Sequence, residues 1–266
     1  MPLTVGQTQA LQARARQLVE AVATTSCTYD RNYGRKYSRG EVLTVFGKAA
    51  PSITLTTDDL NDLVGTQGFC VTKRALARIG ARLLRVAEPT DSDAAKFAAL
   101  VLLWGYASQS HGAYRVGGIL SGDRVRLGQN TVVSLKALEA GDLSGAYQTW
   151  LGQRHIHGLG EPSFTRILYF LGKAISPDTP LALIKDRVVS ERAATVFAMP
   201  LLRDRSLGSY LAYIEVLAVC SQATGFPKER LEEFLSSVPP ASLPGYAPFS
   251  AIQEGFPHAE AVVNVG

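Results

Sequence analysis

The sequence predicts a mostly α-helical protein, and three observations support this fold class. Apolar residues recur with helical spacing, as where Phe164, Ile167 and Leu171 stand at positions i, i+3 and i+7. Stretches with the pattern of a strand are few and short, and the chain has no internal repeat. With 266 residues, of which 46% are hydrophobic and 19% charged, the chain is long and apolar enough to bury a core.

The N-terminal third predicts helices separated by short breaks. One helix is expected over residues 7–23, which present leucine and valine on one face, and a short one within 52–63 with Asp58 as its cap. Residues 71–86 form an amphipathic pattern whose polar side is rich in lysine and arginine. Threonine and aspartate residues then precede the apolar run 94–108, which predicts a buried helix with an N-terminal cap.

The remaining chain alternates between helical and irregular segments. Residues 112–128 are rich in glycine and are expected to form loops. Further helices are expected over 132–138, 145–151, 186–197, 210–222 and 228–236. The organisation predicted from this pattern is a basic helical region at 1–90, a core at 91–238 and an irregular tail at 239–266, all of which can pack as one unit.

Composition narrows the class of protein. No apolar run reaches the roughly 18–20 residues of a membrane span, and the N-terminus lacks the basic and apolar regions of a signal peptide. Three scattered cysteines, Cys27, Cys70 and Cys220, form no disulfide framework and no metal motif, which favours a reducing cytoplasm. The net charge of +4 fits a polyanionic partner without proving one.

One stretch, residues 153–172, has the layout of a helix, a tight hairpin and a second helix. Gly158 and Gly160 stand where the backbone must turn sharply or approach another group, and Ile156 and Leu159 are placed to anchor the hairpin in the core. A hairpin that opens a helix directs unpaired N–H groups outward at the positive end of the helix dipole, which suits a phosphate. The alternative is an ordinary helical hairpin whose glycines only relieve crowding.

The hairpin and an aspartate downstream of it resemble the helix-hairpin-helix DNA glycosylases, and within them the 8-oxoguanine glycosylase-like branch. In that family the helix after the hairpin leads to a loop and to an aspartate that opens the next helix; here Asp186, within 180–190, has that place. The resemblance extends in helix order from about Phe97 to Leu235, although only the hairpin and Asp186 are specific. It implies a mostly α fold with two helical lobes and an active-site cleft between them.

The resemblance also implies roles for individual residues. The hairpin would hold a DNA phosphate, whatever the base sequence. Its carbonyl groups could share a monovalent cation. No other metal ion and no cofactor is expected. Asp186 would be the catalytic carboxylate that stabilises positive charge on the sugar, or only the cap of its helix. The expected DNA-binding residues are His157, Gly158, Leu159, Gly160, Arg166, Lys185 and Arg187. For His157, Lys185 and Arg187 the alternative is a plain surface position.

The chain departs from the lysine-bearing members of the family at one position. Two residues after the second hairpin glycine, those members carry an amine that attacks the sugar, whereas this chain has Pro162. This difference favours a monofunctional enzyme that uses water, and it weakens an assignment to 8-oxoguanine. Lys173 and Lys185 stay open as displaced amines.

The expected substrate is double-stranded DNA with one base flipped out of the helix, bound by a monomer. Trp104, Tyr106 and His111 are candidates for the base pocket, and plain core packing is the alternative for Trp104. The Tyr/Arg-rich residues 29–39 form either a nucleic-acid contact or a surface loop. Repair and defence against phages with modified DNA are both open as roles, and the alternative function is a DNA-binding protein without catalysis.

Overall fold

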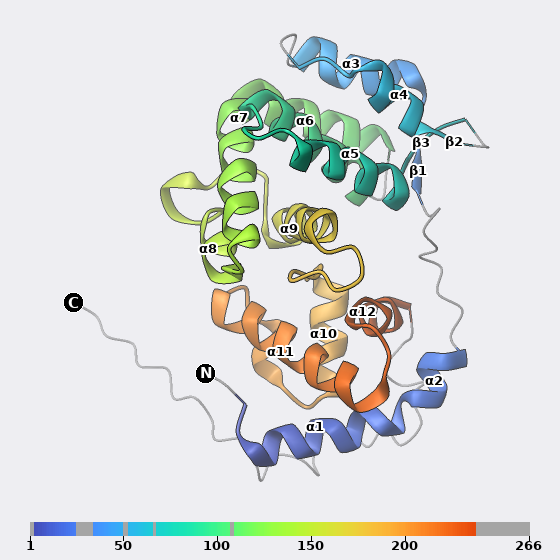
Figure 1. Cartoon of the computed structure of the whole chain (residues 1–266), viewed down its shortest axis with the longest axis vertical. Helices are drawn as coiled ribbons and strands as arrows, with labels where there is room; N and C mark the ends of the chain where they lie inside the picture. Colours follow the sequence, from blue (N-terminus) through green and yellow to red (C-terminus); the bar gives the residue numbers. More distant parts are fainter. Residues whose placement is uncertain (1–2, 25–33, 50–52, 66–67, 107–108, 238–266) are drawn as a thin grey trace. The chain divides into compact units, whose positions relative to one another are not determined.

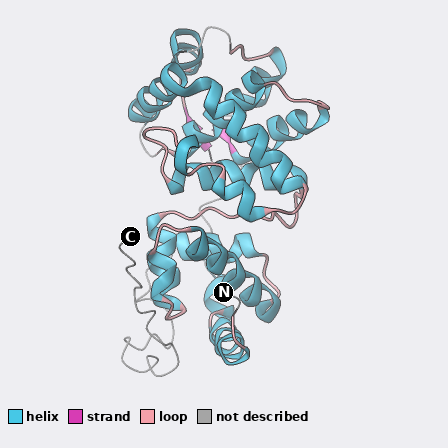
Figure 2. Cartoon of the chain, turned by 90° about the vertical axis from the view of Figure 1, so that its left-hand side faces the viewer, coloured by secondary structure: helices cyan, strands magenta, loops and turns pink. Residues whose placement is uncertain are grey.

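A computed structural model of the chain describes residues 3–24, 34–49, 53–65, 68–106 and 109–237. These residues form twelve α-helices, two short 3₁₀ helices and three short strands. Figure 2 shows helices throughout the described chain, with the strands confined to one small region. The predicted mostly α fold class is therefore confirmed. Residues 29–33 of the Tyr/Arg-rich stretch and the predicted tail 239–266 lie outside the described residues.

The chain divides into two compact units. The hairpin unit runs from Cys27 to Arg187, and the terminal unit combines Met1–Ser26 with Val188–Gly266. The hairpin of residues 155–160 and Asp186 both belong to the hairpin unit. This division joins two ends of the sequence and has no boundary near residue 90, because it follows tertiary packing rather than local composition.

Helix α6, Asp91–Gly105, forms the centre of the hairpin unit. Every residue from Ala94 to Trp104 is buried, because α5, α7 and α9 all pack against this helix. The Thr90 hydroxyl caps it by accepting a hydrogen bond of 3.1 Å from the Asp93 amide. The predicted buried helix is confirmed, although it begins and ends three residues earlier than expected.

The expectation of loops over residues 112–128 is wrong, because these residues belong to the long helix α7, Gln109–Glu139. The helix runs alongside α6 (Figure 1) and is kinked at Asp123, where φ is −131° and ψ is 24°. Two of its glycines permit close packing: a Cβ at Gly112 would lie 2.9 Å from the Tyr106 Cβ atom, and one at Gly128 would lie 2.1 Å from the Asp91 carbonyl oxygen. At these two positions glycine therefore serves close contact inside a helix, whereas a Cβ at Gly118 or Gly122 would meet nothing within 4 Å.

A small antiparallel sheet precedes α5 and was not expected. Its strands β1 (Gly34–Lys36), β2 (Val64–Gly65) and β3 (Gly68–Thr72) have the order β1-β3-β2, with Arg35 opposite Val71 and Val64 opposite Phe69. The predicted helix start at Val71 is therefore wrong; α5 spans Lys73–Arg85 and is capped by the Thr72 hydroxyl.

Tyr37 follows β1 and is buried in the hairpin unit. Its hydroxyl donates a hydrogen bond of 2.7 Å to the Leu103 carbonyl, and burial is the main cause that raises the pKa of this phenol to about 12. At least this residue of the Tyr/Arg-rich stretch is therefore part of the core.

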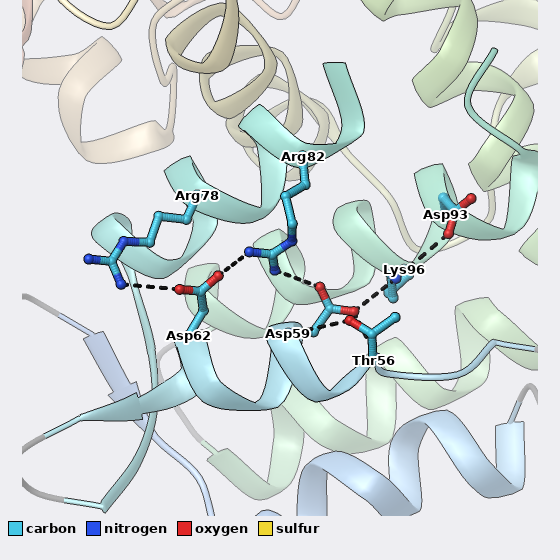
Figure 3. A network of polar contacts seen from close by, with 7 residues as sticks. All are labelled: Thr56, Asp59, Asp62, Arg78, Arg82, Asp93 and Lys96. Atoms are coloured by element: carbon cyan, nitrogen blue, oxygen red, sulfur yellow. Dashed lines mark hydrogen bonds and ion pairs between the residues drawn. The ribbon is translucent and has the colours of Figure 1, made fainter. Parts of the chain in front are cut away.

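An ion-pair network holds α4, Thr57–Leu63, against α5 and α6 (Figure 3). Asp59 accepts from Arg82 at 2.8 Å and pairs with Lys96 at 2.9 Å, and Asp62 pairs with Arg78 and Arg82. Burial alone would raise the pKa of Asp59, but hydrogen bonds from Lys96 and Arg82 outweigh it and lower this pKa to about 2. Thr56, rather than the predicted Asp58, caps α4.

Two more helices, α3 and α8, belong to the hairpin unit. Helix α3, Arg39–Ala49, packs on α7 and begins with a reciprocal pair of hydrogen bonds between Ser38 and Glu41. Helix α8, Leu143–Gln148, follows α7 and precedes the hairpin.

The terminal unit consists of α1 (Val5–Gln17), α2 (Val19–Thr24), α10 (Arg187–Val196, except its first residue), η2 (Pro200–Arg203), α11 (Leu207–Thr224) and α12 (Lys228–Ser237). The single helix predicted over 7–23 is broken at Leu18, which is buried. Helix α1 packs on α11, and Arg14 donates to the Val196 carbonyl at 3.2 Å. In the part of the chain that the structure describes, no helix has the length and apolar character needed to cross a bilayer.

Candidate functional site

The predicted hairpin is present as a tight turn between two helical segments. A 3₁₀ turn, η1 (Gly152–Arg154), leads into it, and α9 (Glu161–Ile175) follows it. The Leu159 amide donates to the Ile156 carbonyl at 3.1 Å, which closes the turn, and Gly158 has a φ of +80°. A residue with a side chain is strained at this φ, so glycine is needed here for its backbone conformation.

The apolar and polar residues of the hairpin separate as predicted. Ile156 and Leu159 are each 1% exposed, which confirms that they anchor the turn in the core. His157, Gly158 and Gly160 are exposed. Gly160 is the N-cap residue of α9, and within the described residues no side chain caps this helix start. The exposed positive end of α9 thus lies next to two exposed glycines, an arrangement that can bind an anion.

Helix α7 and a pair of stacked aromatic rings support the hairpin. The Asn130 amide donates to the Arg154 carbonyl at 2.9 Å, and the Arg126 guanidinium donates to the His155 carbonyl at 3.1 Å. Phe164, which follows the hairpin in the chain, stacks on Trp150, which precedes it, with 6.0 Å between the ring centroids. The hairpin is therefore fixed at both its backbone and its apolar side.

Asp186 directly precedes α10 and is partly exposed, with 30% of its side-chain surface accessible. The Arg166 Nη2 atom lies 3.7 Å from its Oδ2 atom, which makes an ion pair between α9 and the last residues of the hairpin unit. Arg166 passes close to the backbone of α6, because a Cβ at Gly105 would lie 2.7 Å from its Cδ atom. The structure thus brings Arg166 to Asp186, while Arg187 is exposed beside it.

Lys185 is not at the surface, so the alternative that it is a solvated surface residue is wrong, and its amine is directed at a buried carboxylate. Its side chain is 0% exposed, and its Nζ atom lies 3.2 Å from the Glu161 Oε1 atom. The Tyr147 hydroxyl donates to the same oxygen at 2.8 Å. Burial and this carboxylate raise the pKa of Tyr147, so the phenol stays protonated. No local pattern indicates this burial, because a lysine between isoleucine and aspartate is compatible with a buried or an exposed position.

The three candidates for the base pocket are in different environments. Trp104 is buried in the core, with its ring 5.1 Å edge-on from Phe170 and the Lys73 amine 6.0 Å above it. Tyr106 and His111 do lie together, edge to face at 6.2 Å, and His111 is exposed. The Tyr106 hydroxyl is buried without a hydrogen-bond partner among the described residues.

A groove of about 1180 Å³ extends from the hairpin along the first half of α7 to α3. His157 and Gly158 form one end, and Tyr114, which is 81% exposed, and Arg115 lie on the α7 side. The expectation of loops over 112–128 concealed this groove, because α7 lines it together with α3 and the hairpin. The only hint of this groove in the sequence is the neighbouring aromatic and basic pair, Tyr114 and Arg115. No group of three or more His, Cys, Asp or Glu that could hold a metal occurs among the residues described by the structure.

Comparison with known proteins identifies the family. A family model described as "Putative 8-oxoguanine DNA glycosylase OGG-like protein" matches residues 48–236, which is more than half of the chain and includes both the hairpin and Asp186. No curated protein and no solved structure matches the chain. The chain therefore belongs to the family of OGG-like 8-oxoguanine DNA glycosylase proteins.

Proposed function

We propose that the protein is a monofunctional DNA N-glycosylase that removes a damaged or modified base by hydrolysis. The observation that carries the proposal is the partly exposed Asp186 carboxylate, held by Arg166 within the same unit as the exposed hairpin. Membership of the OGG-like family supports DNA as the substrate.

In this proposal the hairpin holds the DNA backbone. The amides of Gly158 and Gly160, at the positive end of α9, bind one phosphate, and hairpin carbonyls share a monovalent cation when one is present. Exposed His157 and Arg187 add contacts to the backbone. Arg166 faces Asp186 instead of the solvent-exposed hairpin residues, so its proposed role is to orient the carboxylate. Lys185 is not among the proposed contacts, because its amine is buried against Glu161.

Asp186 supplies the chemistry in the proposed reaction. When the bond between the sugar C1′ and the base nitrogen breaks, its electron pair leaves with the base, and positive charge develops on the sugar. A fixed carboxylate stabilises this charge and orients a water molecule for attack on C1′. The water oxygen ends on C1′, one of its protons passes to solvent or the carboxylate, and the departing base gains a proton. The products are a free base and an abasic site.

Two features support water rather than an amine as the nucleophile. Pro162 occupies the position two residues after Gly160 and has no amine. Lys185, one of the two displaced candidates, has a side chain with 0% exposure that is directed at Glu161. Lys173 stands in the last turn of α9, several turns away along the helix from the hairpin.

The substrate is proposed to be duplex DNA in which the target base is flipped out. Tyr106 and His111 are proposed as pocket residues because an exposed imidazole and a buried hydroxyl without a partner lie side by side there. Trp104 is no longer proposed to touch the base, because it is packed in the core. The role, repair or defence against phages with modified DNA, depends on which base is released.

The test is a panel of duplexes, each with one modified base, incubated with the protein and then treated with alkali to cleave abasic sites. The panel includes oxidised purines and the modified pyrimidines of phage DNA, and unmodified duplex is the control. Strand cleavage that requires alkali supports a monofunctional glycosylase. Tight binding to duplex without release of any base would support the alternative, a DNA-binding protein without catalysis.

A further inference from the structure

We propose that the buried Glu161–Lys185 pair is a positioning device that fixes Asp186 relative to the hairpin, an inference that rests on the proposed glycosylase function. Glu161 directly follows Gly160, and Lys185 directly precedes Asp186. The pair therefore connects the residue after the proposed phosphate site to the residue before the proposed catalytic carboxylate.

The side chains of the pair are almost fully removed from solvent. Lys185 is 0% exposed and Glu161 is 8% exposed, with 3.2 Å between Nζ and Oε1. Tyr147 in α8 donates to the same Oε1 atom at 2.8 Å. Three elements, α8, the first turn of α9 and the segment before α10, thus meet at one carboxylate oxygen.

The backbone of Lys185 is tied to the same turn of α9. Its amide donates to the Thr165 Oγ1 atom at 3.2 Å, while the Thr165 hydroxyl donates to the Glu161 carbonyl at 2.8 Å. Both the side chain and the main chain of Lys185 therefore contact the first five residues of α9. A shift of the peptide that carries Asp186 would break bonds at two separate points.

Stability does not explain why a charged pair stands here. Burying two charges removes their hydration, and apolar residues of similar volume are often as stabilising or more so. An ion pair differs from an apolar contact in that its attraction depends on a defined geometry. A small displacement of a catalytic group can lower a rate by about 100-fold, so a geometric constraint next to Asp186 has a direct use.

The test compares Lys185→Met with the double variant Glu161→Gln/Lys185→Met, which removes both charges at similar size while glutamine keeps an acceptor oxygen for the Tyr147 hydroxyl. A matched control is Asp59→Asn/Lys96→Met, which disrupts another buried pair in the same unit that has no contact with the hairpin or Asp186 among its ion pairs. Three quantities are measured where each variant is fully folded: the thermal midpoint, the affinity for duplex and the single-turnover rate of base release.

We expect the thermal midpoint, the duplex affinity and the rate of base release to respond differently to these substitutions. The double variant should regain most of the thermal midpoint that Lys185→Met loses and should bind duplex with unchanged affinity, yet release base about 10- to 100-fold more slowly than wild type. Amide hydrogen exchange at residues 186–190 should become faster in both variants. The control pair should lower the midpoint and leave the single-turnover rate unchanged.

Two contrary outcomes are distinguishable. If the double variant regains both the midpoint and the wild-type rate, the pair contributes to stability alone and the positioning role is refuted. If the wild-type protein releases no base from any duplex in the panel, the proposed function is refuted, and this inference is refuted with it.

Discussion

The Arg166 guanidinium lies 3.7 Å from the Asp186 carboxylate and connects the second turn of α9 to the end of the hairpin unit. At this distance between Nη2 and Oδ2 the two groups form an ion pair. The carboxylate is thus held by an opposite charge while 30% of its side-chain surface stays accessible. This combination suits a group that must be fixed and must still reach a substrate.

Asp186→Asn is expected to abolish most catalysis while the fold is retained. Asparagine has nearly the same shape but no charge, and losing one well-placed electrostatic group costs about 10²- to 10³-fold in rate. Single-turnover base release measures the effect, and circular dichroism checks the fold. Asp178→Asn, an exposed loop position, is the control and should release base at the wild-type rate. Full activity of Asp186→Asn would reduce Asp186 to a structural residue.

Borohydride is expected to trap no covalent complex between the protein and its substrate DNA. Trapping requires a Schiff base between an amine and the sugar, and Pro162 stands where that amine would be. The measurement is a gel under denaturing conditions with labelled duplex, and a lysine-dependent glycosylase serves as the positive control. A trapped adduct would overturn the water mechanism, and Lys173→Ala would then show whether Lys173 is the amine.

Gly158→Ala is expected to weaken binding to every duplex by a similar factor, because phosphate contacts carry no base code. Gly141→Ala is a matched control: both glycines have positive φ, +80° and +76°, and a Cβ at either would meet nothing within 4 Å. Both variants should therefore lose a similar stability, about 1–2 kcal/mol. Only the hairpin variant should lose affinity, as measured by fluorescence anisotropy. Equal affinity of the two variants would exclude the hairpin as a phosphate site.

Duplex affinity is expected to fall steeply with salt concentration, since each phosphate contact releases counterions. The slope of log affinity against log salt reports the number of contacts. Arg187→Ala should reduce the magnitude of this slope by about one if Arg187 touches a phosphate. An affinity that is flat between low and moderate salt would point to a partner other than DNA.

Asp59 is expected to make stability depend on pH in the acid range. Its pKa is lowered from 3.8 to about 2 in the folded protein, so its stabilisation is complete above pH 3.8 and is lost as the pH falls towards 2. The shift corresponds to about 2 kcal/mol. Urea unfolding at pH 5 and at pH 2.5 measures it, and Asp59→Asn should lose less stability than wild type between these values. An equal loss in both proteins would show that Asp59 does not titrate in this way.

The sequence predicts the structure correctly where a local pattern of residues has a single physical explanation. Ile156 and Leu159 alternate with exposed hairpin residues, and both are buried as predicted. Asp186 was located by its distance from the hairpin, and it does stand directly before α10. Both predictions depend on neighbours within a few residues or on family spacing.

Local patterns failed where tertiary contacts decide the structure. Gly128 looks like a loop residue in sequence, yet it lies inside α7, where the Asp91 carbonyl leaves no room for a side chain. Lys185 looks like a surface residue, but its partner Glu161 is in another helix. Tyr37 is buried, and its hydroxyl donates a hydrogen bond to the carbonyl of Leu103, which is far along the chain. None of these partners can be identified from residues nearby in the sequence.

The pairing of α1 with α11 has a consequence for the order in which the chain folds during synthesis. Helix α1 ends at Gln17 and α11 begins at Leu207, so the ribosome completes the entire hairpin unit between the two partners. The hairpin unit is continuous in sequence and can assemble as it emerges. Helix α1 has to wait, with Leu11 and Ala15 uncovered, until α11 leaves the exit tunnel. Docking of the first helix is thus among the last steps of folding, and a nascent chain stalled before Leu207 would carry a formed hairpin and an undocked N-terminus.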